Sequence, residues 1–216
     1  MKLSDVPWWA WAGGVGLVAL LIAERDEVGD VVNEAVDEVE AVVQTGVAMG
    51  GALGQALQYA GFFQASAAKY GLRASVLASV CWRESAFGLT LSPPGPAGVG
   101  DAGHGRGLMQ IDDRSHAVWL AVNNWRDPAT NIDGGAEILA QAYAYFRMPG
   151  ASANDPRPLS GAALDKAALA AYNAGAGAVL RAIIAGQDPD SVTTGHDYGS
   201  WILGRVDSVA SQVGLV

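Results

Sequence analysis

The sequence contains few of the residues that build disulfides and zinc sites. It has one cysteine, Cys81, and three histidines in 216 residues. One thiol cannot form a disulfide within the chain, and these four residues show no zinc-ligand spacing such as His-Glu-x-x-His. The sequence therefore argues against a metal-dependent peptidase, and we expect neither a metal ion nor another cofactor.

Basic residues are also scarce, with 13 Lys and Arg against 22 Asp and Glu. Proteins that grip nucleic acid concentrate Lys and Arg on one surface, so we expect no nucleic-acid partner. Lys2 and Arg25 are the only basic residues among the first 56, which contain nine acidic ones. The rest of the chain is nearly neutral, and ligand binding there should depend on a groove rather than on long-range charge.

An uncharged, largely apolar run covers residues 6–23 and has three tryptophans near its start. Its length is near the lower limit for a helix that crosses a bilayer. Lys2 precedes the run and acidic residues follow it, which predicts a cytoplasmic N-terminus and places residues from 24 onward outside the cytoplasm. We interpret residues 1–23 as a membrane anchor that contacts lipid through residues 6–23. A cleaved signal peptide and a buried core helix are the alternatives.

Residues 24–56 form an acidic segment between this run and the larger part of the chain. Small apolar residues recur at steps of three and four over residues 24–45, which predicts an amphipathic helix. A solvated spacer helix and a short coiled coil, through which copies of the chain would self-associate, both fit this pattern. Gly46, Gly50 and Gly54 follow at intervals of four and fit either a hinge or close helix packing.

From residue 57 to 216 the sequence predicts one mainly helical domain, in which Gly and Pro separate the helices. Two longer breaks, residues 88–107 and 149–161, are rich in Gly or Pro and predict loops. The predicted helices cover residues 57–70, 74–84, 115–122, 131–147, 163–173, 176–185 and 198–213.

One carboxylate occupies an unusual position. Glu84 comes seven residues after Leu77 and three after Cys81, spacings that place it on the apolar face of its helix. Burial would disfavour its charged form, raise its pKa and keep a proton available for general acid catalysis. The alternative is a structural glutamate paired with an arginine, for which the candidates are Arg83, Arg106 and Arg114.

Three short motifs in order give a specific resemblance. They are Arg83-Glu84-Ser85, Gly107-Leu108-Met109-Gln110 and Ala171-Tyr172-Asn173-Ala174-Gly175. With these motifs the chain resembles the goose-type lysozymes, whose domain is shared with the bacterial lytic transglycosylases, over about residues 67–198. The resemblance implies a lysozyme-like α+β fold, mainly helical, with a glycine-rich active-site loop.

The resemblance also implies roles for individual residues. Glu84 matches the general acid that protonates the glycosidic oxygen, and Asp101 and Asp112 match the pair thought to position water in goose-type lysozymes. Lytic transglycosylases generally lack that pair. Residues matched to the substrate groove are Ser85, which would support the acid rather than react, His104, Gln110, Tyr172, Asn173 and Tyr198.

These matches have structural alternatives. Asp101 and Asp112 would also serve as caps of a turn and of a helix, and Asn173 as a helix C-cap. His104 would equally be a solvent-exposed loop residue. The loop over residues 89–99 is a few residues longer than in the animal enzymes, which affects the expected reach of Asp101, and the disulfides of those enzymes are missing.

The sequence thus leads to three hypotheses. The first is a peptidoglycan muramidase that hydrolyses the β-1,4 bond between N-acetylmuramic acid and N-acetylglucosamine outside the cytoplasm. The second is a lytic transglycosylase, which leaves 1,6-anhydro-muramic acid ends. The third is a non-catalytic glycan-binding or structural component of a cell envelope or a virion.

Overall fold

The computed structural model describes residues 51–215. The predicted membrane anchor, residues 1–23, and the acidic helix, residues 24–45, lie outside the described residues. Over residues 51–215 no helix combines the length and the apolar character needed to span a bilayer. Chain contacts define a compact unit over Ala52–Val216, and residues 52–56 are helical, with Ala52, Leu53 and Ala56 buried.

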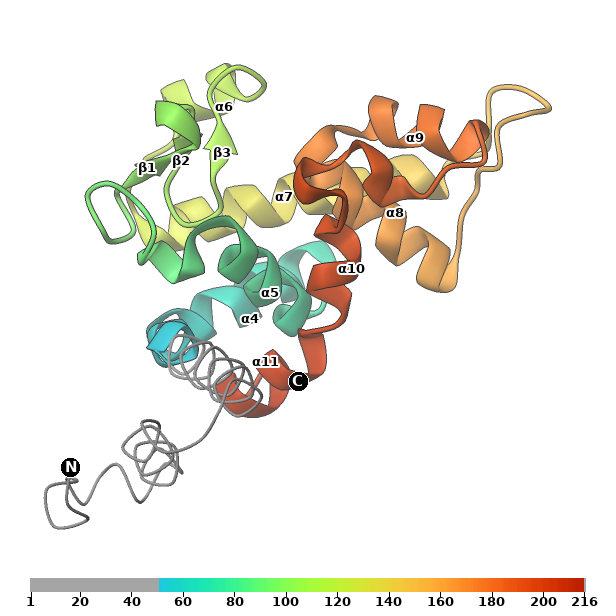
Figure 1. Ribbon diagram of the computed structural model, residues 1–216. Coiled ribbons are helices and arrows are strands. Elements are labelled where there is room, and N and C mark those ends of the chain that lie inside the picture. Colours follow the sequence, from blue (N-terminus) through green and yellow to red (C-terminus); the bar gives the residue numbers. More distant parts are fainter. Residues whose placement is uncertain (1–50, 216) are drawn as a thin grey trace, which may run out of the picture. The chain divides into compact units, whose positions relative to one another are not determined.

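Helices make up most of this unit (Figure 1), which confirms that the domain is mainly helical, as predicted. The α-helices are α4 (Ala60–Tyr70), α5 (Ala74–Ser85), α6 (Ala117–Val122), α7 (Pro128–Arg147), α8 (Gly161–Ala174), α9 (Ala176–Ile184), α10 (Tyr198–Leu203) and α11 (Val206–Val213). Short 3-10 helices are η3 (Leu57–Tyr59), η4 (Ala86–Gly88), η5 (Asp101–Gly103), η6 (Pro189–Val192) and η7 (Thr194–His196).

The glycine-rich break after α5 contains a small antiparallel sheet. Its strands are β1 (Val99–Gly100), β2 (Gly105–Arg106) and β3 (Ile111–Asp112), in the order β1-β2-β3. Gly105 pairs with Gly100 on one side and with Asp112 on the other. A Cβ atom at Gly100 or Gly105 would collide with the side-chain amide of Gln110. The glycines therefore let Gln110 pack against the sheet.

Two predicted helix boundaries were wrong. α7 begins at Pro128 rather than at residue 131, because Asp127 caps it by accepting the Thr130 amide at 2.8 Å and proline fits the first helical position. The single helix predicted over residues 198–213 is two helices. The chain leaves the helical path at Arg205, whose φ is −119°, between the end of α10 and the start of α11.

Helix α5 lies at the centre of the core and packs against α4, α10 and α11. Leu77, Val80 and Cys81 are fully buried, which confirms the apolar face predicted from their spacing. α5 ends beside the glycine-rich segment in Figure 1. Its packing therefore fixes the position of Glu84, its second-to-last residue.

Candidate active site

Ser85 ties the end of α5 to the glycine-rich segment. Its hydroxyl donates to the Leu108 carbonyl at 2.7 Å and accepts the Gly88 amide at 3.0 Å. The Ser85 side chain is fully buried, so it lies behind the pocket wall rather than in the groove that the resemblance implied. This serine holds the backbone on both sides of the chain reversal after Glu84.

Two more helices hold the backbone of the same segment. Asn131 of α7, fully buried, accepts the Met109 amide at 2.8 Å and donates to the Arg106 carbonyl at 3.0 Å. Tyr172 of α8 donates to the Met109 carbonyl at 2.7 Å. Side chains from α5, α7 and α8 thus fix residues 106–110, and Gln110 is held at a left-handed φ of 48°.

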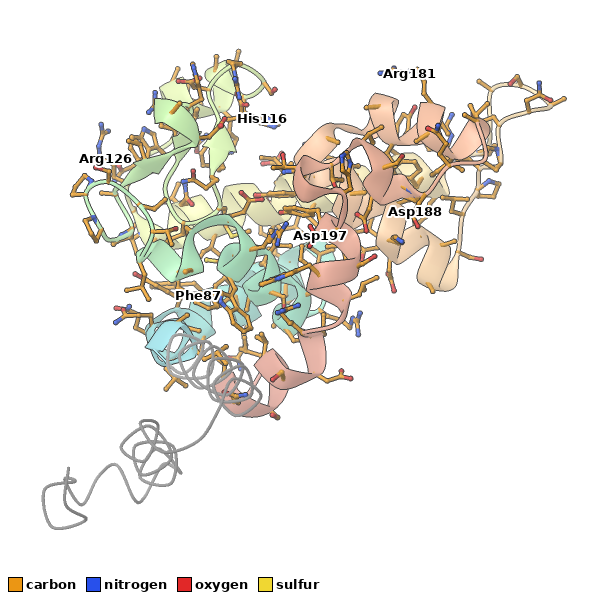
Figure 2. The ribbon with its side chains drawn as sticks, in the orientation of Figure 1. Phe87, His116, Arg126, Arg181, Asp188 and Asp197 are labelled. Carbon is orange, nitrogen blue, oxygen red and sulfur yellow. The ribbon has the colours of Figure 1, made fainter. Side chains whose placement is uncertain are left out.

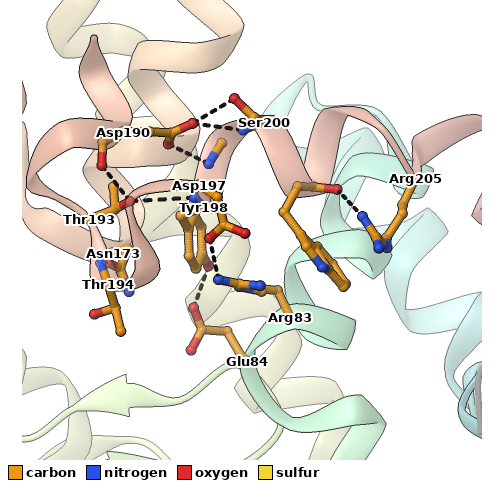
Figure 3. Close-up of polar contacts among 12 residues, drawn as sticks. Arg83, Glu84, Asn173, Asp190, Thr193, Thr194, Asp197, Tyr198, Ser200 and Arg205 are labelled. Atoms are coloured by element: carbon orange, nitrogen blue, oxygen red, sulfur yellow. Dashed lines mark hydrogen bonds and ion pairs between the residues drawn. The ribbon is translucent and has the colours of Figure 1, made fainter. Parts of the chain in front are cut away.

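Glu84 projects from α5 toward the start of α10, where the Tyr198 hydroxyl donates to its carboxylate (Figure 3). The carboxylate is half-buried. Burial raises the pKa of Glu84 to about 7, against smaller lowering effects from the Tyr198 hydroxyl and the Arg83 charge. At neutral pH a substantial fraction of Glu84 therefore carries a proton.

Tyr198 is itself held by the turn that precedes α10. Its amide donates to the Thr193 hydroxyl at 3.4 Å. Asp190, 2% exposed, accepts the Gly199 amide at 2.7 Å and the Ser200 amide at 3.0 Å, and so caps the first turn of α10. Figure 3 shows this cap and the Tyr198 ring between Asp190 and Glu84.

The arginines that the sequence offered as partners of Glu84 form ion pairs elsewhere. Arg83 donates to Asp197 at 2.6 Å and lies over the Trp201 ring at 5.1 Å. Arg106 binds Asp113 at 2.6 Å. Among residues 51–215 no ion pair includes Glu84, so the hypothesis of a salt-bridged structural glutamate is wrong for this part of the chain.

Arg114 joins the two aspartates that the resemblance matched to water positioning. Its guanidinium contacts Asp112 at 2.6 Å and Asp101 at 2.8 Å. Hydrogen bonds from Arg114 are the largest cause lowering the pKa of Asp112 to about 2, so Asp112 is ionised at any physiological pH. Asp101 lies in η5, where its backbone has a left-handed φ of 46°.

A pocket of about 440 Å³, named here the Glu84 pocket, brings several of these side chains together. Seven of the residues that the resemblance matched to the active site line it: Glu84, Asp101, Gln110, Asp112, Tyr172, Asn173 and Tyr198. His104 does not line it. Its Nδ1 atom lies 2.9 Å from a carboxylate oxygen of Asp113, a residue that does not line the pocket either.

A second pocket, of about 510 Å³, continues from the first and is named here the α7 pocket. The two share Gln110, Asp112, Tyr172 and Asn173. Its other walls come from α7, the end of α8 and His116, which faces α8 and α9 in Figure 2. The two pockets together form an extended cleft with Glu84 in one part of it.

Several residues that line the cleft were not predicted from the sequence. Arg114 and His116 come two and four residues after Asp112, so their closeness in sequence to a matched residue was the available signal. Residues from α7 gave no signal, because only tertiary packing brings them to the cleft. The residues not singled out as cleft-lining are Arg83, Gly105, Ile111, Arg114, Ser115, His116, Ile138, Gln141, Ala142, Tyr145, Ala171, Ala174, Gly175, Ala176 and Thr194.

The cleft is built from carboxylates, amides and tyrosines rather than from soft metal ligands. Cys81 is buried in the core and lines neither pocket. Within the described part of the chain, His, Cys, Asp and Glu side chains form no group of three suited to a metal ion. The carboxyl groups that line the Glu84 pocket are those of Glu84, Asp101 and Asp112.

Comparison with known proteins agrees with this geometry. The Transglycosylase SLT domain family matches residues 61–191, which include Glu84 and every other residue of the Glu84 pocket except Thr194 and Tyr198. Because this match covers more than half of the chain, the protein belongs to the Transglycosylase SLT domain family.

Two curated relatives are bird lysozymes. The chain is 31% identical over 131 residues to lysozyme g of Casuarius casuarius and to lysozyme G of Dromaius novaehollandiae. The matched region is 61% of this chain, and it spans 61% and 55% of the two relatives. The resemblance to goose-type lysozymes and lytic transglycosylases is thereby confirmed.

Proposed function

We propose that this protein is a peptidoglycan muramidase that cleaves the β-1,4 bond between N-acetylmuramic acid and N-acetylglucosamine. The observation that carries the proposal is a half-buried carboxylate, Glu84, with its pKa raised to about 7, in the same pocket as two further carboxylates. Membership of the SLT domain family and similarity to two bird lysozymes support the same substrate class.

Glu84 supplies the proton in this proposal. A general acid works best when its pKa is near the working pH, because it is then protonated often enough and still gives up its proton readily. The half-buried Glu84 carboxyl meets that condition at neutral pH. It protonates the glycosidic oxygen as the bond to the muramic acid carbon breaks, and the leaving sugar departs as a neutral alcohol.

Asp101 and Asp112 position the water that attacks the other face of the sugar ring. Inversion needs a carboxylate on that face, at a distance that leaves room for water. Both aspartates line the Glu84 pocket, and Arg114 holds them on one guanidinium group. Arg114 acts as a positioning residue, because it keeps two like charges side by side that would otherwise repel each other.

The same ion pairs favour a second candidate, a lytic transglycosylase. A carboxylate with a pKa of about 2 is a weak base, and both aspartates already accept hydrogen bonds from Arg114. In this alternative the 6-hydroxyl of the muramic acid attacks in place of water. Glu84 keeps its role, and the product ends in 1,6-anhydro-muramic acid.

Product analysis separates the two reactions. We expect mass spectrometry of digested peptidoglycan to show reducing muramic acid ends from the unmodified protein. The double variant Asp101→Asn, Asp112→Asn should form fewer reducing ends, since it lacks the charges that hold water, while anhydro ends make up more of the remaining product. Mainly anhydro ends from the unmodified protein would favour the transglycosylase.

A non-catalytic glycan-binding or structural role is the third candidate. A binding module gains nothing from a protonated carboxyl at its pocket, whereas an acid catalyst requires one. A zymogram with purified peptidoglycan tests this difference, since a clearing band excludes a pure binder.

The substrate lies outside the cytoplasm, which agrees with the predicted anchor in residues 1–23 and with an outward-facing domain.

A further inference from the structure

Two neighbouring contacts join the end of α5 to the start of α10. Arg83 donates to Asp197 at 2.6 Å, and the next residue along each segment takes part in the hydrogen bond from Tyr198 to Glu84. Figure 3 shows the two contacts beside each other. Arg83 and Glu84 are thus adjacent in the chain and oppositely charged when ionised, yet each binds a residue of α10 or its N-cap instead of the other.

Arg83 is the arginine of the Glu84 pocket that could neutralise Glu84. The pocket is lined by two arginines, Arg83 and Arg114. Arg114 already contacts two aspartates of the pocket wall, at 2.6 Å and 2.8 Å. Within residues 51–215 the ion-pair partner of Arg83 is Asp197. If Asp197 were neutral, Glu84 would be the carboxyl group of the pocket left for Arg83 to bind.

Asp197 occupies the N-cap position of α10, but its carboxylate makes no capping hydrogen bond. An N-cap aspartate normally accepts the amide of the second or third helical residue. Those residues are Gly199 and Ser200, and both amides donate to Asp190. Because Asp190 caps the helix, the Asp197 carboxylate is left for Arg83.

The Arg83 guanidinium also packs against the aromatic side chains of α10. Its centre lies 5.1 Å from the Trp201 ring and 5.9 Å from the Tyr198 ring, distances at which an aromatic face attracts a cation. Gly195 leaves room for the ion pair, since a Cβ atom there would lie 3.0 Å from the Asp197 carboxylate and 3.4 Å from the guanidinium. α10 and the turn before it therefore hold the Arg83 charge.

This ion pair is too exposed to act mainly as a source of stability. The Arg83 side chain is 24% exposed and the Asp197 side chain 48% exposed, and ion pairs so close to solvent contribute little to folding. The Glu84 carboxyl is half-buried and desolvated. A charge placed beside it acts more strongly than the same charge in water.

We propose that Asp197 is a positioning residue, which holds the Arg83 guanidinium on α10 and prevents Arg83 from forming an ion pair with Glu84. This inference rests on the proposed function, in which Glu84 must carry a proton. An opposite charge in contact with Glu84 would stabilise the ionised carboxylate, and the proton would be lost at neutral pH. Asp197 thus preserves the protonated acid, although it does not itself line the Glu84 pocket.

Several other groups act on the charge of Glu84. Burial is the largest influence on its pKa and raises it, the Tyr198 hydrogen bond and the Arg83 charge lower it, and the Asp101 charge raises it. Substitution of Asp197 leaves these groups unchanged, so a shift in the pKa of Glu84 reports on Arg83. The titratable and charged groups around Glu84 are Arg83 and Cys81 of α5, Asp101 of η5, Asp112 of β3, the following Arg114, Tyr172 of α8 and Tyr198 of α10.

Nuclear magnetic resonance measures the effect without any substrate. The full chain is labelled with isotope-enriched glutamate, Glu84→Gln identifies the Glu84 carboxyl signal, and a titration gives its pKa. Asp197→Asn should lower the pKa of Glu84 by about 1 to 3, the effect of an opposite charge within about 4–6 Å. Arg83→Met should raise it, because the variant lacks a charge that lowers it.

A purely structural role predicts the other direction for Asp197. If Asp197 only held α10 in place, Asp197→Asn would loosen Tyr198 from Glu84, and the pKa of Glu84 would rise. A raised or unchanged pKa in Asp197→Asn would overturn the proposal. Asp133→Asn is the matched control and should leave this pKa unchanged, since Asp133 forms a partly exposed ion pair with Lys69 at 2.7 Å and does not line the Glu84 pocket.

The double variant Arg83→Met, Asp197→Asn tests whether Asp197 acts through Arg83. Its Glu84 pKa should equal that of Arg83→Met alone, because no guanidinium is left to move. A further fall on adding Asp197→Asn would mean that Asp197 acts directly, which contradicts the proposal. Asp197→Ser, which is also neutral and suits an N-cap, gives the same test if the amide variant does not fold.

Cleavage rates separate this proposal from the proposed function. If Glu84 is the acid, Asp197→Asn should move the alkaline limb of the kcat/KM profile to lower pH and reduce kcat/KM at pH 8 about tenfold or more. A lowered pKa in a chain that cleaves no peptidoglycan would refute the muramidase proposal and leave the role of Asp197 standing. Glu84-dependent cleavage with an unshifted pKa in Asp197→Asn would do the reverse.

Discussion

Glu84 combines two properties that oppose each other. Its half-buried carboxyl has a pKa of about 7, against about 4.5 for an exposed glutamate. This keeps a proton available for the proposed general acid catalysis. The charged form, however, is disfavoured by the surroundings, so the folded state loses stability as pH rises from about 4.5 through about 7 and Glu84 ionises.

Glu84→Gln should therefore separate activity from stability. The amide keeps the shape of the side chain but gives up no proton, so we expect cleavage to fall by about 10²- to 10⁴-fold. Above pH 7 the variant should be more stable than the unmodified protein by about 1 to 3 kcal/mol, because it lacks the ionised carboxylate. Peptidoglycan turnover and thermal unfolding at pH 5 and pH 8 measure both effects. Near-normal turnover by a folded variant would mean that the acid is misassigned.

Tyr198 influences the same proton from the opposite side. Its hydroxyl donates to Glu84 and lowers the pKa of that carboxyl. In Tyr198→Phe the donor is missing, the pKa of Glu84 rises, and the alkaline limb of the kcat/KM profile should move to higher pH. Tyr70→Phe is the control, since the Tyr70 hydroxyl contacts Asp133 at 3.2 Å instead. An alkaline limb that stays in place, or moves to lower pH, would contradict this role.

The elements of the domain matter to the site mainly through their ends. Glu84 is at the end of α5 and Tyr198 at the start of α10, and the two helices pack against each other. A six-residue helix such as α10 has little stability alone, since nucleation is costly. Its position depends on the Asp190 cap and on packing against α5 and α8.

Asp190→Ala should destabilise the domain more than its place in a short connection suggests. Asp190 is buried and accepts hydrogen bonds from the Gly199 amide, the Ser200 amide and the Ser200 hydroxyl. Removing these acceptors leaves donors unpaired, and we expect a loss of about 2 to 4 kcal/mol in the free energy of unfolding. Asp207→Ala, at an exposed position in α11, should change stability by less than about 0.5 kcal/mol. Equal effects of the two variants in urea unfolding would argue against the cap.

At the scale of the whole molecule, the compact unit over Ala52–Val216 contains every residue assigned to the cleft. We expect a fragment of residues 52–216 to fold and to cleave soluble peptidoglycan fragments as the full chain does. The full chain, but not this fragment, should float with lipid vesicles if residues 6–23 form the anchor. Circular dichroism, cleavage rates and flotation check these outcomes. An unfolded fragment would contradict the independence of the unit, and a full chain that stays unbound would contradict the anchor.

The sequence alone determined the local features of this protein. Helix positions follow from periodicity and from Gly and Pro breaks, which act over a few residues, and so does the placement of Glu84 on the apolar face of α5. The motifs around Glu84, Gln110 and Tyr172 were sufficient to indicate the family. The start of α7 and the break at Arg205 were missed, because a cap and a local departure from helical angles leave little trace in hydrophobic periodicity.

Tertiary structure alone decided how these local features interact. Glu84 and its partner Tyr198 are 114 residues apart in the chain, and so are Arg83 and Asp197. Periodicity cannot say which arginine reaches which carboxylate, because that depends on how helices distant in sequence pack. The same holds for the α7 pocket, which combines residues of α7 and α8 with Ser115 and His116. Desolvation of Glu84, and with it the pKa that a general acid needs, exists only once these surfaces have closed around the carboxyl group.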